Sequence, residues 1–285
     1  MNNKTLFVIT LLIFLFGVSL VSAHQPRISD SVQTIVEDPE ISKAYYSHLA
    51  RDMQSYVINS KVPFTLYVNI LVPDILGQKK DVSAAVIQDG NLDNPLAVLV
   101  GTEFEWKKFH EPFANDDYWK GPEYKANVTA GTYEIRVWSS NNDSKYSLAI
   151  GEKELFSLKE ILNVAKLVPQ IKHDFFNESP TNFIFSIFGV GYVVLLFLFS
   201  FLFGFLYRFL LKQFAKGTVR GLNKNINVRD RLLRVFIGIV LFLLAITSTW
   251  NPVLIFISGF CFFEAIFSWC GIYAALGKNT CPIDV

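Results

Sequence analysis

Apolar and polar positions alternate with a period of two through much of the first half of the chain. Residues 64–72 place an apolar side chain at every second position, which predicts a strand with one buried face. The same reasoning predicts six further strands, at residues 54–59, 82–88, 96–100, 124–128, 133–137 and 144–150. Segments rich in Asn, Asp and Gly separate them, as turns do. Short strands at this spacing predict an antiparallel β-sandwich of jelly-roll type over residues 24–156.

Two other segments predict helices outside a membrane. Residues 157–181 carry apolar side chains at helical spacing, which predicts a helical stem that Pro169 ends or kinks. Residues 40–49 are expected to form a short helix before the first strand.

Long apolar runs follow the stem. Residues 182–211 predict a first transmembrane span, and residues 232–250 and 253–276 predict a hairpin that turns at Asn251-Pro252. Each run of about 20 residues is long enough for a bilayer core of about 30 Å. With these runs the sequence predicts a multidomain membrane protein with an α-helical region of three spans.

Residues 1–23 have the pattern of a secretory signal peptide. A lysine near the start precedes an apolar run, and small residues come directly before His24. An uncleaved signal anchor is the alternative, and it leaves the location of the next domain unchanged. Residues 24–181 are therefore expected to be extracytoplasmic.

Charge is distributed unevenly along the chain, which is 51% hydrophobic. Residues 24–181 hold 16 Lys and Arg against 22 Asp and Glu, whereas residues 208–234 hold eight basic residues and one acid, Asp230. A basic loop between apolar runs is typical of the cytoplasmic side of a membrane. Residues 212–227 and the C-terminus are thus expected inside, in a multi-pass protein of the cell (inner) membrane. Membrane lipid is the expected partner, and nucleic acid is not.

The last segment, residues 228–285, carries a recognisable motif. An Asp230-Arg231 start and two apolar runs lead to Cys270-Gly271-Ile272-Tyr273, then Leu276-Gly277 and Asn279-Thr280-Cys281. This pattern resembles the YgaP-like transmembrane domain, a small bacterial and archaeal module. The resemblance implies a membrane hairpin with a cytoplasmic tail. Some members of that family carry a rhodanese-type sulfurtransferase, for which this chain has no counterpart, so the resemblance implies no activity.

The β-rich region has a resemblance of its own. Ala130-Gly131-Thr132-Tyr133, followed by a strand and then Tyr146-Ser147-Leu148, is similar to the last hairpin of pre-peptidase C-terminal domains and related secreted β-sandwiches. This resemblance implies the fold of a secreted β-sandwich.

Three residues of the hairpin are candidates for chemistry. Cys270 and Cys281 predict a thiol pair at the inner membrane face, because Gly277 lets the chain reverse between them. The alternative is that Cys270 packs in the helix and Cys281 follows a capping turn. Glu264 lies within an apolar run, where a carboxylate is costly unless it is protonated or paired. It is a functional candidate, or it bonds a neighbouring helix or a second copy in a homodimer through the hairpin.

Aromatic and acidic residues mix in one segment of the β-rich region. This pattern predicts a loop that binds a sugar or a cation. The alternative is that the aromatics cover one end of the sandwich while the acids stay solvated. The candidate ligand residues are Trp106, His110, Glu111, Asp116, Asp117 and Trp119.

His24 would become the first residue after signal cleavage. Its free amine and imidazole then predict a small copper site, with His48 or His110 as a third ligand. The alternative is a histidine that merely follows the cleavage site.

The sequence holds no phosphate-binding glycine loop, nucleophile elbow or Cys-x-x-Cys pair. We therefore expect a membrane protein that presents an extracytoplasmic β-sandwich to an unknown ligand, and we do not expect an enzyme. Thiol or sulfur handling through Cys270 and Cys281 and copper handling through His24 are the alternative functions.

Overall fold

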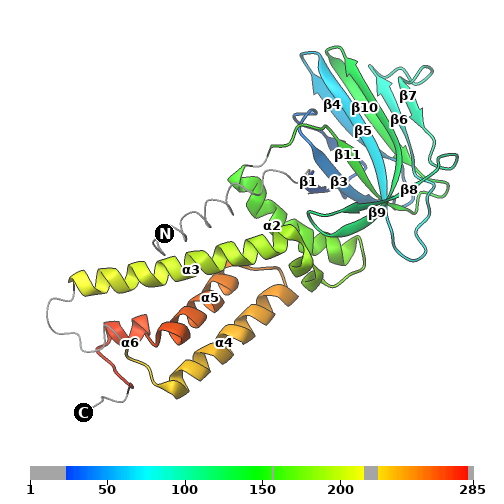
Figure 1. Cartoon of the computed structure of the whole chain (residues 1–285). Coiled ribbons are helices and arrows are strands. Elements are labelled where there is room, and N and C mark those ends of the chain that lie inside the picture. The colour runs from blue at the N-terminus through cyan, green and yellow to red at the C-terminus, as the bar shows by residue number, and fades with distance from the viewer. Residues whose placement is uncertain (1–23, 156, 215–223, 282–285) are drawn as a thin grey trace, which may run out of the picture. The chain divides into compact units, whose positions relative to one another are not determined.

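The computed structural model describes residues 24–155, 157–214 and 224–281, whose elements are drawn in Figure 1. The predicted signal peptide, the middle of the basic loop and the last four residues lie outside the described residues. The chain divides into two compact units. A β-rich unit consists of Met1–Leu167 with Asp174–Asn177, and a helical unit consists of Val168–His173 with Glu178–Val285.

Two sheets make up the β-rich unit. One is six-stranded, in the order β1-β3-β11-β5-β9-β8, and the other is five-stranded, in the order β2-β4-β10-β6-β7. All seven predicted strands are present as β4 to β7 and β9 to β11. The bounds are β1 Gln25–Ile28, β2 Gln33–Ile35, β3 Lys43–His48, β4 Gln54–Ser60, β5 Phe64–Pro73, β6 Ser83–Gln88, β7 Ala97–Leu99, β8 Lys107–Glu111, β9 Asp116–Val128, β10 Gly131–Trp138 and β11 Lys145–Ile150.

Side chains from both sheets form one buried cluster. Leu66 and Val68 of β5 and Ile135 and Val137 of β10 are fully buried in it. Both strands lie inside their sheets, so their backbone groups are hydrogen-bonded on both edges. Burying each of these side chains contributes about 1.5–3 kcal/mol. The alternation seen in the sequence is thus the pattern of this core.

The β-rich unit departs from the predicted topology at its start. The pairings β1 with β3 and β2 with β4 are parallel, so the sheets are not wholly antiparallel. The helix expected at residues 40–49 is wrong, since β3 is a strand. Tyr45 enters the core cluster, while Tyr46 packs edge-on against Phe175 and bonds the Tyr118 hydroxyl at 2.8 Å. Because both faces of β3 are covered, its sequence lacks alternation.

The predicted stem is the helix α2, Leu158–Asp174. Pro169 lies inside the helix and does not end it. At its C-terminus, the Lys145 ammonium donates to the carbonyls of Asp174 at 2.7 Å and Phe175 at 3.0 Å. A lysine in this position satisfies carbonyls that have no partner within the helix.

The helical unit contains a 3-10 helix, η2 Pro180–Phe185, and the helices α3 Ile187–Phe214, α4 Val228–Thr247, α5 Pro252–Phe267 and α6 Gly271–Ala275. Helix α5 packs against both α3 and α4, as Figure 1 shows. The contact with α3 is close at Gly259, where a Cβ atom would lie 2.4 Å from the Ser200 hydroxyl. On its other side, Ser258 of α5 donates a hydrogen bond of 2.8 Å to the Gly238 carbonyl of α4.

One helix among the described residues is long and apolar enough to cross a membrane, the 27-residue stretch Ile187–Gln213 of α3. Helix α5 is apolar but has 16 residues, and at 1.5 Å per residue it is about 24 Å long. The return span predicted at residues 253–276 is not a single helix. Ser268 has a left-handed backbone (φ 53°) that ends α5, and α6 begins only after Cys270. One of the three predicted spans is therefore clear from length and composition.

Candidate functional site

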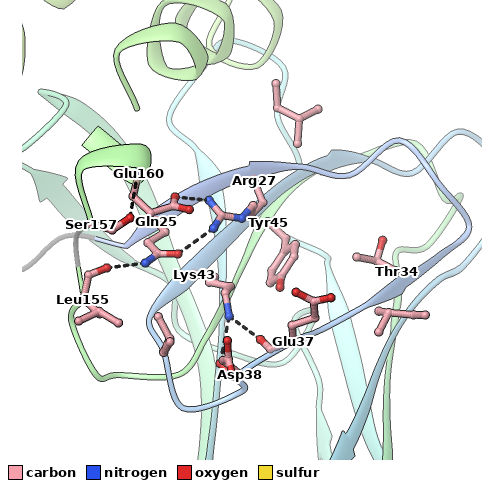
Figure 2. A pocket seen from close by; sticks show the side chains of 13 residues that line it. Gln25, Arg27, Thr34, Glu37, Asp38, Lys43, Tyr45, Leu155, Ser157 and Glu160 are labelled. Carbon is pink, nitrogen blue, oxygen red and sulfur yellow. Dashed lines mark hydrogen bonds and ion pairs between the residues drawn. The ribbon is translucent and has the colours of Figure 1, made fainter. Parts of the chain in front are cut away.

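A cleft of about 440 Å³ opens in the β-rich unit. Strands β1 and β2, which line it, are the edge strands of the two different sheets, and β3 and the start of α2 complete the lining. Figure 2 shows the polar side chains that meet there. The cleft therefore lies where the chain crosses from one sheet to the other and back.

The two cations of the cleft are already engaged. Arg27 forms an ion pair of 2.9 Å with Glu160 and donates to the Gln25 amide oxygen at 2.8 Å. The buried Lys43 ammonium donates to the backbone carbonyls of Glu37 and Asp38. Burial lowers the pKa of Lys43, and the nearby Asp38 carboxylate partly offsets this effect. These contacts fix the wall of the cleft.

Tyr45 lies at the buried side of the cleft. Its side chain is 5% exposed and its ring packs 5.2 Å from the Tyr56 ring. Burial raises the pKa of Tyr45 to about 12, so the phenol is neutral at physiological pH. Within the described part of the chain, its hydroxyl has no hydrogen-bond partner. A neutral phenol that lines a cleft can donate one hydrogen bond to a ligand and accept another.

The segment expected to be a ligand-binding loop is instead a hairpin of β8 and β9. Trp106, just before β8, is buried in the core cluster and donates from Nε1 to the Gly101 carbonyl at 2.8 Å. Trp119 also packs against this cluster and donates to Asp74 at 2.8 Å. The Lys80 ammonium lies 3.7 Å from the centre of the Trp119 ring. Both indoles thus have contacts within the unit.

The acids of this hairpin lie in different surroundings. Asp117 is exposed and faces the His110 ring at 2.9 Å, whereas Asp116 is buried. Glu111 accepts hydrogen bonds of 2.8 Å from the backbone of Phe113 and Ala114, which closes the turn between the strands. The six candidate residues therefore lie in different surroundings, and ligand binding by this hairpin stays a prediction.

His24 lies next to β1. Its Nδ1 atom is hydrogen-bonded to the Ser42 hydroxyl, which leaves Nε2 for other partners. Burial lowers the pKa of His24, against a smaller opposite effect of Glu154. Among the described residues, no group of three or more His, Cys, Asp or Glu side chains could hold a metal ion. His48 and His110 pair instead with Asp143 and Asp117, and the copper site stays a prediction.

A polar cluster occupies the break between α5 and α6. Glu264 forms an ion pair of 2.8 Å with Arg234 of α4, and its second oxygen accepts a hydrogen bond of 3.0 Å from the Gly271 backbone. Both side chains are largely buried, with exposures of 9% and 12%. The Arg231 guanidinium donates to the Ala265 carbonyl at 2.7 Å. The intramembrane acid of the sequence analysis therefore has a partner within the same chain.

Cys270 is enclosed by the same cluster. It is 1% exposed, and its backbone exchanges two hydrogen bonds with the Asn225 side chain, at 2.7 and 2.9 Å. The Arg234 guanidinium interacts with its thiol side chain. Cys281 is partly exposed and both cysteines are free. Communication between the two thiols stays a prediction.

The two ends of the motif lie together in space. Thr280 bonds the Asp230 carboxylate and, through its backbone, the Asn225 carbonyl at 3.0 Å. Sequence reasoning missed Asn225 and Arg234. Arg234 could have been found, because it and Glu264 carry opposite charges on the two facing arms of the predicted hairpin. Asn225 gave no such signal, because its role depends on the break after α5.

Residues 222–284 match the family described as inner membrane protein YgaP-like, transmembrane domain. The solved pre-peptidase C-terminal domain of collagenase from Bacillus anthracis is similar to the chain at 10% identity, with a TM-score of 0.25, over 45% of this chain and 95% of that one. CorA, a surface-associated copper-binding protein of Methylomicrobium album BG8, is similar at 9% identity, with a TM-score of 0.24, over 45% of this chain and 100% of CorA. Comparison with curated proteins finds no match.

Proposed function

We propose that this chain is an integral membrane protein that presents a β-sandwich binding domain outside the cytoplasm on a three-span anchor. The observation that carries the proposal is the apolar surface of the helical unit. Leu202 and Phe209 of α3 and Leu232 and Phe236 of α4 are each more than half exposed. Apolar side chains of this size and number favour contact with lipid chains over water.

The basic residues favour one orientation. The C-terminal end of α3 and the N-terminal end of α4 lie at the same end of the helical unit (Figure 1). Arg229 and Lys278 are exposed, and the chain between α3 and α4 contains further Lys and Arg residues. Such residues are enriched on the cytoplasmic side. The β-rich unit, which precedes an odd number of spans, then lies outside the cytoplasm.

We propose that α4 forms the second span and that α5 and α6 together form the third. Helix α5 alone is short for a bilayer core, but the break and α6 continue the chain in this span. In the break, Glu264 accepts a hydrogen bond from the Gly271 N–H and Asn225 accepts one from the Cys270 N–H. Backbone breaks at membrane depth are tolerated where protein groups satisfy them.

The two sheets that share one core support the sandwich, and the cleft between their edges supports a binding role.

Topology is the experiment that tests this proposal. Single cysteines replace Asp93, in the β-rich unit, and Lys278, after α6, in a background without native cysteines. In intact cells, a membrane-impermeant maleimide should label D93C at once and K278C only after permeabilisation. A reporter that works only in the cytoplasm should be active when it is fused after Val285. A reporter that works only outside the cytoplasm should be inactive at the same position. Labelling of K278C from outside, with D93C protected, would reverse the model.

Thiol handling is the second candidate function, favoured by the contact between Arg234 and Cys270. Diamide accepts two electrons and two protons when two thiols form a disulfide, so it tests whether Cys270 and Cys281 communicate. The measurement is maleimide labelling of Cys270 in membranes before and after diamide, in the native chain and in Cys281→Ser. Loss of labelling in the native chain alone supports a thiol pair. Identical labelling in every sample removes this candidate.

A further inference from the structure

We propose that the β-rich unit rests on the bilayer surface through the loop between β5 and β6, residues 74–82. In this arrangement Leu76 enters the lipid, and Lys79 and Lys80 contact anionic headgroups. The partner is the lipid surface around the chain's own membrane span. The docking rests on the proposed membrane anchor and adds the surface by which the β-rich unit meets the bilayer.

Leu76 lies at the tip of this loop. Its relative exposure is 104%, so its whole side chain faces away from the protein. The turn around it is formed, because the Gln78 N–H donates to the Ile75 carbonyl at 3.2 Å and Gly77 has a left-handed backbone (φ 81°). A single exposed leucine is ordinary on a protein surface. What lies beside it decides its role.

Lysines lie beside the tip. The ammonium groups of Lys80 and of Lys108 in β8 lie 3.7 and 5.1 Å from the centre of the same Trp119 ring. Lys108 is paired with Asp74 at 2.9 Å. Lys79 and Lys80 are exposed, and neither forms an ion pair with any described residue. An exposed apolar side chain next to unpaired lysines suits an anionic bilayer, which takes up the apolar group and attracts the charges.

The acids of the loop already have partners. Besides its ion pair, Asp74 accepts a hydrogen bond of 2.8 Å from the Trp119 indole. Asp81 accepts hydrogen bonds from the Ser140 N–H at 3.3 Å and from the Ser144 hydroxyl at 3.0 Å. The charge that the loop offers to an outside partner is therefore positive, which favours anionic headgroups.

The same loop lies where the chain leaves the β-rich unit for the membrane. The Gln78 amide donates to the Lys145 carbonyl at 3.1 Å. The Lys145 ammonium in turn donates to the carbonyls of Asp174 and Phe175, at the end of α2. The loop and the exit of the chain are therefore neighbours.

Little chain separates this exit from the membrane span. Of the residues between Asn177 and Ile187, where α3 begins, six form η2. They advance the chain by about 12 Å, at about 2.0 Å per residue, and the other steps add at most about 14 Å. The exit thus lies within about 26 Å of the start of the span, which keeps the loop near the bilayer surface.

Hydrogen–deuterium exchange of the full chain in lipid nanodiscs tests the docking. The bilayers are phosphatidylcholine alone and phosphatidylcholine mixed with phosphatidylglycerol. Amides of residues 74–82 should exchange more slowly in the anionic bilayer, because lipid covers the docked loop. Residues 89–96, between β6 and β7 at the other end of β6, should exchange equally in both. The slowing of exchange gives the ratio of docked to undocked protein.

Two variants separate the lysines from the leucine. Lys79→Gln with Lys80→Gln should lower the docked-to-undocked ratio about 25-fold, since each lysine near an anionic surface contributes about fivefold. Leu76→Ser should lower it about tenfold, because the side chain that enters the lipid is lost. Neither variant removes the contacts of Asp74 or Gln78, so the loop should keep its conformation.

The matched control is Lys61→Gln with Lys125→Gln. Lys61 precedes β5 and Lys125 pairs with Tyr67, so both exposed lysines lie toward the other end of β5. This control should dock like the native chain, and unchanged unfolding midpoints should show that all variants fold.

Equal exchange of the loop in the two bilayers would overturn the docking, and so would an equal loss in the control and in the variant of Lys79 and Lys80. A reversed topology would instead overturn the proposed function. It would not alter exchange in nanodiscs, because both faces of those bilayers carry the same lipids.

Discussion

Removal of the Glu264 carboxylate should open the helix break that covers Cys270. The variant Glu264→Ala deletes the partner of Arg234 and the acceptor of the Gly271 N–H. An unpaired buried charge costs about 3–5 kcal/mol when its partner is removed. Arg234 keeps a hydrogen bond to the Asp230 carbonyl and lies 5.1 Å from the centre of the Tyr273 ring. We therefore expect the lower end of that range, about 3 kcal/mol.

Glu264→Gln should cost less. A glutamine at this position retains an oxygen for the Gly271 N–H but removes the charge that pairs with Arg234. The expected loss is about 1–2 kcal/mol, in the range of a hydrogen bond to a charged group. Combining Arg234→Ala with Glu264→Ala should cost less than the sum of the two single changes, because the double variant leaves no unpaired charge.

Two measurements follow these changes in the full chain in micelles. Tryptophan fluorescence reports unfolding in a denaturing detergent, since Trp269 lies in the break. The rate of Cys270 alkylation, in a Cys261→Ala and Cys281→Ser background, reports opening of the break. If the contacts that Glu264 makes also hold the break closed, losing about 3 kcal/mol of their free energy raises the alkylation rate about a hundredfold.

The control is Arg229→Ala, which removes an exposed charge from the first turn of the same helix. It should change stability by less than about 0.5 kcal/mol and leave Cys270 protected. The reasoning is refuted if Glu264→Ala behaves like this control in both measurements. Such a result would mean that the ion pair is solvated and that other contacts seal Cys270.

Two further predictions concern the β-rich unit. Val68→Asp should abolish its cooperative thermal unfolding, because the carboxylate would be buried without a partner at a fully buried position of β5. Val98→Asp, on the half-exposed edge strand β7, should retain the transition, and equal behaviour of the two variants would contradict the core. If copper binds at a processed His24, one extra residue in front of it should lower copper affinity measured by competition with a chelator. Equal affinity of the two forms would exclude the amine as a ligand.

The strands that carry the core were predictable from local pattern. In β10 and at the start of β5, one face meets the core and the other is partly exposed, so burial there follows the two-residue period of a strand. The apolar stretch of α3 was equally clear, since its length and composition suffice. The YgaP-like segment was found for a different reason, because its residues follow a fixed order along the chain.

Strand β3 and the aromatic-acid hairpin were not predictable in this way. The neighbours of β3 cover both of its faces, so alternation is lost and the segment was taken for a helix. Trp106 and Trp119 suggested a ligand platform, yet their ring surfaces meet the core cluster. Local sequence does not distinguish an aromatic that faces a partner strand from one that faces solvent.

The sequence by itself determined where the chain is β-rich, where it is helical and apolar, and which residues could carry charge or a thiol. Tertiary structure decided which of these groups meet. Glu264 and Arg234 are 30 residues apart and become partners because α4 and α5 pack side by side. Arg27 meets Glu160 across 133 residues, and Tyr45 lines a cleft because the chain crosses between two sheets. The alternation of buried and exposed positions follows from the geometry of neighbouring residues. Contacts between residues far apart in the sequence depend instead on how distant elements pack.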